Sequence, residues 1–161
     1  MRRKYFIAPA LILLSAAFAA AEQIEVRRVG ELVRPSDLIA RVKIVHVRET
    51  GAQEGYGRIA VASVVEALKG TEVGSVVELG SDFVNVVCPN VSYEAGEDVL
   101  LFAKKTPDGR YVTTYAAAGK ISIKDGRVSQ RPFRQDQSYR SAVAEVRREI
   151  MKLEGESMEQ R

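Results

Sequence analysis

The chain has 161 residues, of which 46% are hydrophobic, and it carries 24 Lys and Arg against 21 Asp and Glu. The excess of three positive charges equals the three basic residues at positions 2–4, so the remainder is formally neutral and general nucleic-acid binding is disfavoured. The single cysteine excludes an internal disulfide, and one histidine beside it leaves few ligands for a transition metal, so no cofactor is predicted.

A leader for export is predicted over the first 21 residues. The basic residues at 2–4 precede an apolar run that extends to Phe18, and alanines occupy 19–21. This order is typical of a signal peptide cleaved after Ala21, which predicts a periplasmic or extracellular protein. The run is shorter than the roughly 20 apolar residues of a membrane-spanning helix, so no membrane span is expected after cleavage. The paired arginines leave open whether the leader is an ordinary or a twin-arginine signal.

The remaining residues, 22–161, are predicted to form one domain with its core at about 30–153. A short helix is predicted at 25–34, where apolar residues have helical spacing, although alternation near its start leaves a strand possible. Strands are predicted at 38–47 and 59–68, where apolar and polar side chains alternate, and at 76–79.

The second half of the chain continues with short strands and ends in a helix. Residues 82–97 are predicted to be a long irregular connection. Strands are predicted at 99–103, with both faces covered, and at 111–115. A hairpin at 121–128 turns at its Asp-Gly pair, which suits the positive backbone angles of a tight turn. An amphipathic helix is predicted at 136–153, capped by Asp136 or Ser138 and frayed beyond residue 153.

Five or six sequential strands with a helix at each end predict a mainly β fold. Closure into a barrel removes the exposed edges that short strands leave, so a small closed or partly closed barrel is expected. We predict a five- to six-stranded OB-fold-like barrel, the oligonucleotide/oligosaccharide-binding type, with a sandwich as the alternative.

Three sequence stretches carry a resemblance to a known superfamily. They are Ser36–Val42, an E-x-L-K-G corner at 66–70 and a G-E-x-x-L-L-F strand at 96–102. Together they resemble the netrin-module and tissue-inhibitor-of-metalloproteinases (NTR/TIMP-like) superfamily, in particular its exported bacterial branch. The likeness covers about residues 30–130 and consists of turns and core positions, so it implies a fold more than an activity.

A metalloprotease inhibitor is the alternative function that this resemblance implies. The animal inhibitors of the superfamily act through an N-terminal cysteine whose amino group and carbonyl chelate the protease zinc. Here the expected mature start is Glu22, and no cysteine precedes Cys88. The disulfide that would hold such a wedge rigid is therefore absent, and rigidity supplies much of its affinity.

No residue pattern indicates catalysis, so the protein is not predicted to be an enzyme. A hydrolase is the third alternative function. His46 lies on the apolar face of its strand and is predicted to be partly buried, with no partner to make it a general base. Four carboxylates lie at turns or strand edges, where acidic side chains commonly satisfy backbone groups. These carboxylates are Asp37, Asp82, Glu97 and Asp98.

Basic residues between 104 and 134 suggest a face for an anionic partner. The candidate residues are Lys104, Lys105, Arg110, Tyr111, Lys120 and Lys124. The tyrosine would provide stacking, and a cell-surface polysaccharide would provide the anionic groups. A solvated surface that is balanced by acids elsewhere is the alternative.

The odd thiol of Cys88 is predicted to be buried as a small apolar group or, alternatively, joined to a second molecule. We expect a monomer in preference to a Cys88-linked dimer. The sequence as a whole favours an exported, non-enzymatic binding or interaction module whose ligand is a protein or a cell-surface glycan.

Overall fold

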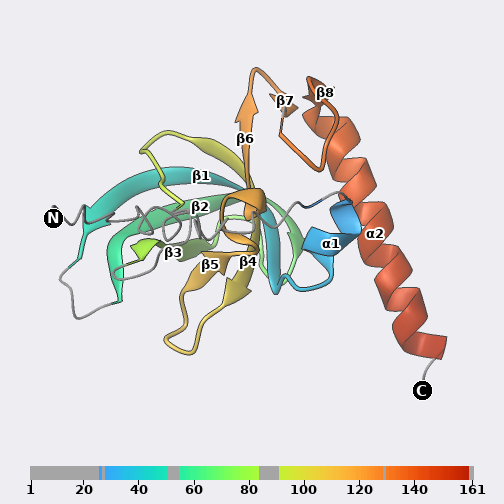
Figure 1. The fold of residues 1–161 in the computed structure, drawn as a ribbon, viewed down its shortest axis with the longest axis horizontal. Helices are drawn as coiled ribbons and strands as arrows, with labels where there is room; N and C mark the ends of the chain where they lie inside the picture. Colours follow the sequence, from blue (N-terminus) through green and yellow to red (C-terminus); the bar gives the residue numbers. More distant parts are fainter. Residues whose placement is uncertain (1–25, 27, 51–54, 84–90, 129, 160–161) are drawn as a thin grey trace, which may run out of the picture.

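The structure is a computed structural model that describes residues 26, 28–50, 55–83, 91–128 and 130–159. It is mainly β, with a short helix near the start of the described chain and a long helix at its end (Figure 1). Its elements are α1 (Val29–Val33), β1 (Leu38–Glu49), β2 (Tyr56–Lys69), β3 (Val76–Phe83), β4 (Asp98–Lys105), β5 (Tyr111–Thr113), the 3-10 turn η2 (Ala116–Gly119), β6 (Lys120–Lys124), β7 (Arg127–Val128), β8 (Gln137–Ser138) and α2 (Tyr139–Glu159).

Five strands close into a barrel in the order β1-β2-β3-β5-β4, because β4 pairs back with β1. The ring is antiparallel except between β3 and β5, which pair in parallel where Leu79 meets Tyr111. This arrangement confirms the predicted OB-fold-like barrel. β6, β7 and β8 continue outward from β4 and lie outside the ring.

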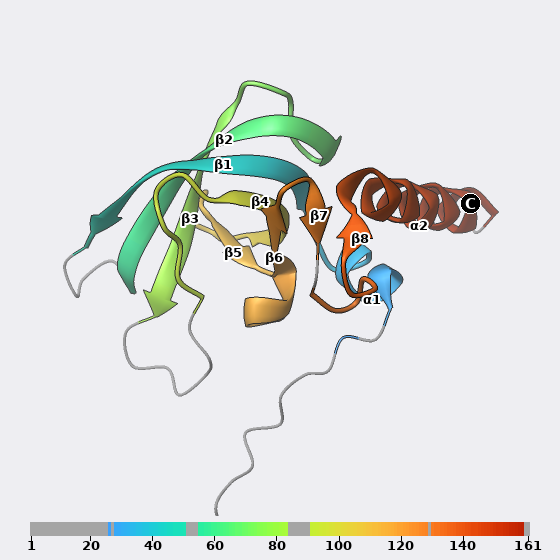
Figure 2. The same cartoon turned by 90° about the horizontal axis from the view of Figure 1, so that it is seen from above.

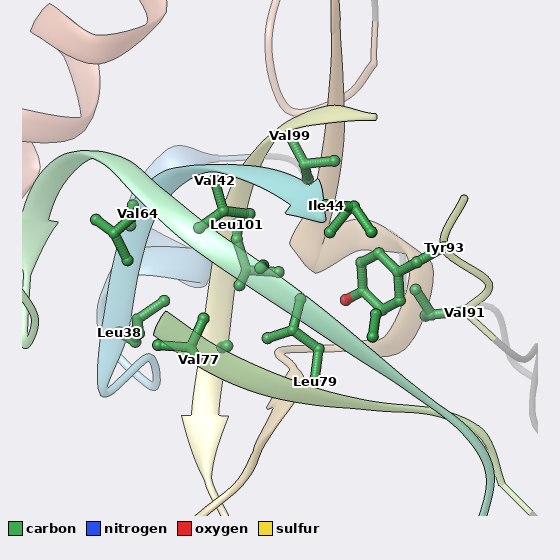
Figure 3. Close-up of a cluster of buried hydrophobic side chains, with 14 residues drawn as sticks. Leu38, Val42, Ile44, Val64, Val77, Leu79, Val91, Tyr93, Val99 and Leu101 are labelled. Carbon is green, nitrogen blue, oxygen red and sulfur yellow. The ribbon is translucent and has the colours of Figure 1, made fainter. Parts of the chain in front are cut away.

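The barrel interior is the first of two apolar cores. Alternate residues of the ring strands meet there, and Figure 3 shows Leu79 and Leu101 among them. At one end, Val91 and Tyr93 from the connection before β4 complete the core beside Ile44. Burial raises the pKa of Tyr93 well above its usual range, and the nearby Glu97 carboxylate raises it further. Tyr93 therefore stays protonated and acts as a plug for the barrel.

Lys120 of β6 holds this plug in place. Its Nζ donates to the Ser92 carbonyl oxygen over 2.6 Å and lies 2.8 Å from a carboxylate oxygen of Glu97. The same Nζ lies 4.9 Å from the centre of the Tyr93 ring, within the range of a cation–π contact. Three contacts from one side chain thus fix the segment that fills the barrel end.

The second core lies between the outside of the barrel and the two helices. Figure 2 shows α1 and α2 on one side of the barrel, next to β7 and β8. Residues of β4 supply both cores: Leu101 points into the barrel, whereas Leu100 and Phe102 point toward the helices. All three side chains are fully buried, which confirms the prediction that both faces of this strand are covered.

The corner after β2 shows why the E-x-L-K-G sequence suits this fold. Lys69 donates from Nζ to the carbonyl oxygens of Val33 and Ser36, at 3.2 and 2.6 Å, and so fixes the end of α1. Gly70 follows with φ of +67°, and a Cβ at this position would lie 1.9 Å from the Asp37 carbonyl oxygen. Glycine is therefore required at this point for both its conformation and its small size.

α2 begins at Tyr139, three residues after its predicted start, and extends beyond its predicted end. The Ser141 amide donates to the Ser138 hydroxyl over 3.3 Å, so Ser138 is the cap, as predicted. The helix continues to Glu159, whereas the sequence predicts fraying after residue 153. Glu156 meets Arg34 of the α1 end at 3.4 Å, and this tertiary contact lies in the extended part. No helix in the described part of the chain is long and apolar enough to cross a membrane.

The Ser138 cap predicts a moderate effect on stability. Ser138→Ala should lower the free energy of unfolding by about 1 kcal/mol, because a donor of the first helical turn loses its acceptor. Urea unfolding followed by circular dichroism measures the change. Ser138→Asp, which retains a capping oxygen, should stay close to the wild type; equal losses in both variants would contradict the capping role.

Candidate functional site

Three β-bulges in the β1–β2 pair place extra side chains on the outside of the barrel. At three positions the register advances by two residues on one strand and by one residue on the other. The inserted residues are Val45 in β1 and Val65 and Leu68 in β2. A bulge sets two consecutive residues opposite one partner, and this re-aims a side chain that strict alternation would place elsewhere.

Two of the inserted residues face solvent. Val45 is 56% exposed and Val65 is 45% exposed, whereas Leu68 packs against the second core. Val76 of β3 is 65% exposed and pairs with Ser63 of β2. Exposed apolar side chains that gather on one surface are typical of protein-binding sites.

We refer to Val45, Val61, Ser63, Val65 and Val76 as the valine face. Val61 and Ser63 are half-buried and lie between the exposed members, on the central strand of the three. The bulges at Val45 and Val65 are separated by three to four residues of β2, or about 12 Å. One partner could therefore cover both.

His46 borders the valine face and corrects a prediction. The sequence places it on an inward face as a partly buried side chain, but the structure places it in solvent. The bulge at Val45 is the cause, because it aligns His46 with Val61 instead of continuing the inward row from Ile44.

A groove lies between β2 and α2, next to Val65. It encloses about 480 Å³. Its lining residues are Glu66, Tyr139, Arg140, Val143, Ala144 and Arg147. Arg140, Val143, Ala144 and Arg147 have the i, i+3, i+4, i+7 spacing of one helix face, so α2 contributes an apolar strip with an arginine at each end.

A network of charged and polar groups forms the side of this groove. Glu66 accepts a hydrogen bond from the Tyr139 hydroxyl at 2.8 Å and another from Arg147 Nη2 at 2.9 Å. Burial raises the pKa of Tyr139, and the hydrogen bond to Glu66 raises it further. The tyrosine therefore remains a hydrogen-bond donor, and both oxygens of the Glu66 carboxylate are occupied.

Arg41 extends the network to β4. Its Nε donates to Asp98 Oδ1 over 2.8 Å, and its guanidinium carbon lies 5.0 Å from the centre of the Tyr139 ring. The hydrogen bond to Asp98 raises the pKa of Arg41 in spite of partial burial. The two carboxylates next to the groove are thus each paired with an arginine.

The structure separates the six residues predicted as an anionic-partner face. Lys104 and Lys105 are exposed at the end of β4, and Tyr111 packs against the first core. Arg110 lies 3.1 Å from a Glu78 oxygen and 3.0 Å from an Asp108 oxygen, so its charge is balanced locally. The Thr106 hydroxyl is the main cause of a lowered pKa at Asp108, which keeps that carboxylate ionised.

The other two members of this set lie elsewhere. Lys120 forms an ion pair with Glu97 next to Tyr93, at the end of the barrel. β4 and β6 run antiparallel, and Lys120 pairs with Leu101. Lys124 and Lys104 therefore lie on opposite sides of this pair, about 23 Å apart along the two strands. The structure therefore does not bring the six residues together on one surface.

The four carboxylates have the local roles that the sequence predicts or are paired with arginine. Asp37 accepts from the Lys105 amide at 2.9 Å, and Glu97 accepts from the Glu94 amide at 3.0 Å. Asp98 is held by Arg41, and Asp82 lies 3.7 Å from Arg58. Among the described residues, no three His, Cys, Asp or Glu side chains are grouped to hold a metal ion.

Cys88 lies outside the described residues, so its predicted burial stays a prediction, as does the preference for a monomer over a Cys88-linked dimer.

Comparison with known proteins finds no protein-family model that matches this chain and no matching curated protein.

Proposed function

We propose that this protein is an exported, non-enzymatic interaction module that binds another protein through its valine face. The observation that carries the proposal is the pair of bulges that turn Val45 and Val65 into solvent. Apolar area is stabilised by about 25 cal/mol per Å² when it leaves water, so a partner that covers these side chains gains free energy.

The chemistry of the face favours a protein over a glycan. Valine has a stiff side chain, so it loses little rotamer freedom when a partner covers it. It also offers no hydrogen-bonding group for a sugar hydroxyl or sulfate. The basic residues that would attract an anionic glycan are dispersed, and Arg110 and Lys120 are paired with acids. A protease is one class of partner that fits, which keeps metalloprotease inhibition as the alternative.

Charge insertion on the valine face tests the proposal. The double variant Val45→Glu/Val65→Glu should lower the capture of partner proteins from the native envelope fraction by about tenfold or more, because buried carboxylates lose hydration without gaining a partner. Tagged protein on a resin, followed by quantitative mass spectrometry, measures the amount captured for each protein.

The matched control is Met151→Glu/Met158→Glu, which changes two exposed apolar residues of α2 to the same acid. It should retain capture to within about twofold. Equal capture by wild type and both variants, all folded by circular dichroism, would contradict the proposal. Loss of metalloprotease inhibition in the valine variant alone would identify a protease as the partner.

A further inference from the structure

We infer that the groove between β2 and α2 receives an acidic, apolar segment of the protein that covers the valine face. The inference rests on the proposed function and adds the chemistry of the partner. Its starting point is continuity: Val65 belongs to the valine face, and its neighbour Glu66 lines the groove. A partner seated on the three strands therefore reaches the groove at its edge.

The groove offers an apolar strip for side chains of the partner. Val143, which is buried, and the exposed Ala144 line it from α2, and the half-buried Tyr139 lines it at the helix start. Tyr139 is held by its hydrogen bond to Glu66 and by the Arg41 guanidinium at its ring. The strip is thus formed in advance, which lowers the entropy that a partner must lose.

The charged residues around the groove determine which charge a bound segment must carry. Glu66 and Asp98 are each paired with an arginine, so their negative charge is balanced. Arg140 lines the groove, and within the described part of the chain no ion pair or hydrogen bond involves its guanidinium. This leaves a positive charge without a counterion at the groove.

Lys43 adds a second such charge on the side of β1. It is exposed, lies in register between Ser63 of the valine face and Asp98 of β4, and makes no ion pair within the described ranges, because Asp98 is paired with Arg41. It lies two residues along β1 from Arg41, or about 7 Å. The combined surface therefore has apolar side chains flanked by two free cations, and a segment that alternates aliphatic and acidic residues complements it.

Two labelled peptides test the inference on the full mature protein. One alternates valine and glutamate, and the other alternates valine and lysine with the same length. The valine–glutamate peptide should bind, and Lys43→Glu/Arg140→Glu should weaken its binding by about tenfold or more at moderate salt. Fluorescence anisotropy measures both affinities. The valine–lysine peptide should bind the wild type more weakly than its acidic counterpart.

The control Lys104→Glu/Lys105→Glu changes the net charge equally at two exposed lysines at the end of β4, beyond the residues that pair with β1. It should change the affinity for the acidic peptide by no more than about twofold. An equal loss in both double variants, equal binding of the two peptides, or no binding of the acidic peptide would overturn the inference. If one of these results is found while Val45→Glu/Val65→Glu still lowers the capture of partner proteins, the proposed partner segment is wrong. The valine face then remains the interaction surface.

Discussion

Replacing Gly70 by alanine is expected to lower the free energy of unfolding by about 3 kcal/mol, the second largest loss predicted for a single change in this protein. Gly70 has a φ of +67°, where a side chain costs about 1–2 kcal/mol. The added Cβ would also lie 1.9 Å from the Asp37 carbonyl oxygen, so the backbone at the start of β1 must move. Urea unfolding followed by circular dichroism measures the loss.

Gly74 provides a matched control for this experiment. It also has a positive φ, of +83°, but a Cβ at this position would have no atom within 4 Å. Gly74→Ala should therefore show the conformational cost alone, about 1–2 kcal/mol. If the two variants lose the same stability, the close approach at Asp37 has no energetic importance and the corner is not required for packing.

Replacing Tyr93 by alanine should have the largest effect, a loss of about 3–5 kcal/mol, because it removes a buried aromatic side chain and leaves a cavity. The ring fills the barrel end beside Ile44, and it also carries the contact with Lys120 (Figure 3). Loss of the ring therefore opens the first core and weakens the hold on the connecting segment. Chemical unfolding measures the free energy, and the urea midpoint should fall strongly.

Tyr93→Phe separates the ring from its hydroxyl group. It keeps the apolar volume and the face toward Lys120, so it should retain most of the stability, within about 1.5 kcal/mol of the wild type. A comparable loss in the phenylalanine and alanine variants would show that the hydroxyl group, and not the filling of the barrel end, dominates.

Sequence patterns predict the elements that depend on local chemistry. The Asp-Gly pair predicts the hairpin at 121–128, and Asp125 and Gly126 have φ values of +50° and +70°. Ile123 pairs with Val128 across it, as expected. The unbroken apolar run at 99–103 is too short for a helix and is bounded by turn residues, so it predicts a strand that is covered on both faces. The predicted N-terminal helix is also present, although it is shorter than the sequence indicates.

The candidate site is not predictable from the sequence, because bulges break the alternation on which strand predictions depend. Strict alternation along β2 places Glu66 in the same row as Ala62 and Val64, which face the interior. An acidic residue in an inward row is the one available signal of a bulge at Val65. The misplacement of His46 has the same origin in β1.

The sequence also does not predict which charged side chains form ion pairs with one another. Arg41 and Asp98 are separated by 57 positions, and Lys120 and Glu97 by 23. No local pattern predicts which of many cations each carboxylate will meet. The basic segment after residue 104 therefore suggests one surface, whereas the fold pairs Arg110 and Lys120 with acids and places Lys124 at the far end of the ladder.

The pairing of β1 with both β2 and β4 has a consequence for how the chain acquires its structure. Leu38 pairs with Ala103, so the ring closes only when segments more than sixty positions apart have met. Such a high contact order makes folding slow compared with that of helical bundles of similar size. A growing chain that ends before β4 lacks one side of the hydrophobic interior, so the interior is complete only after β4 has joined β1.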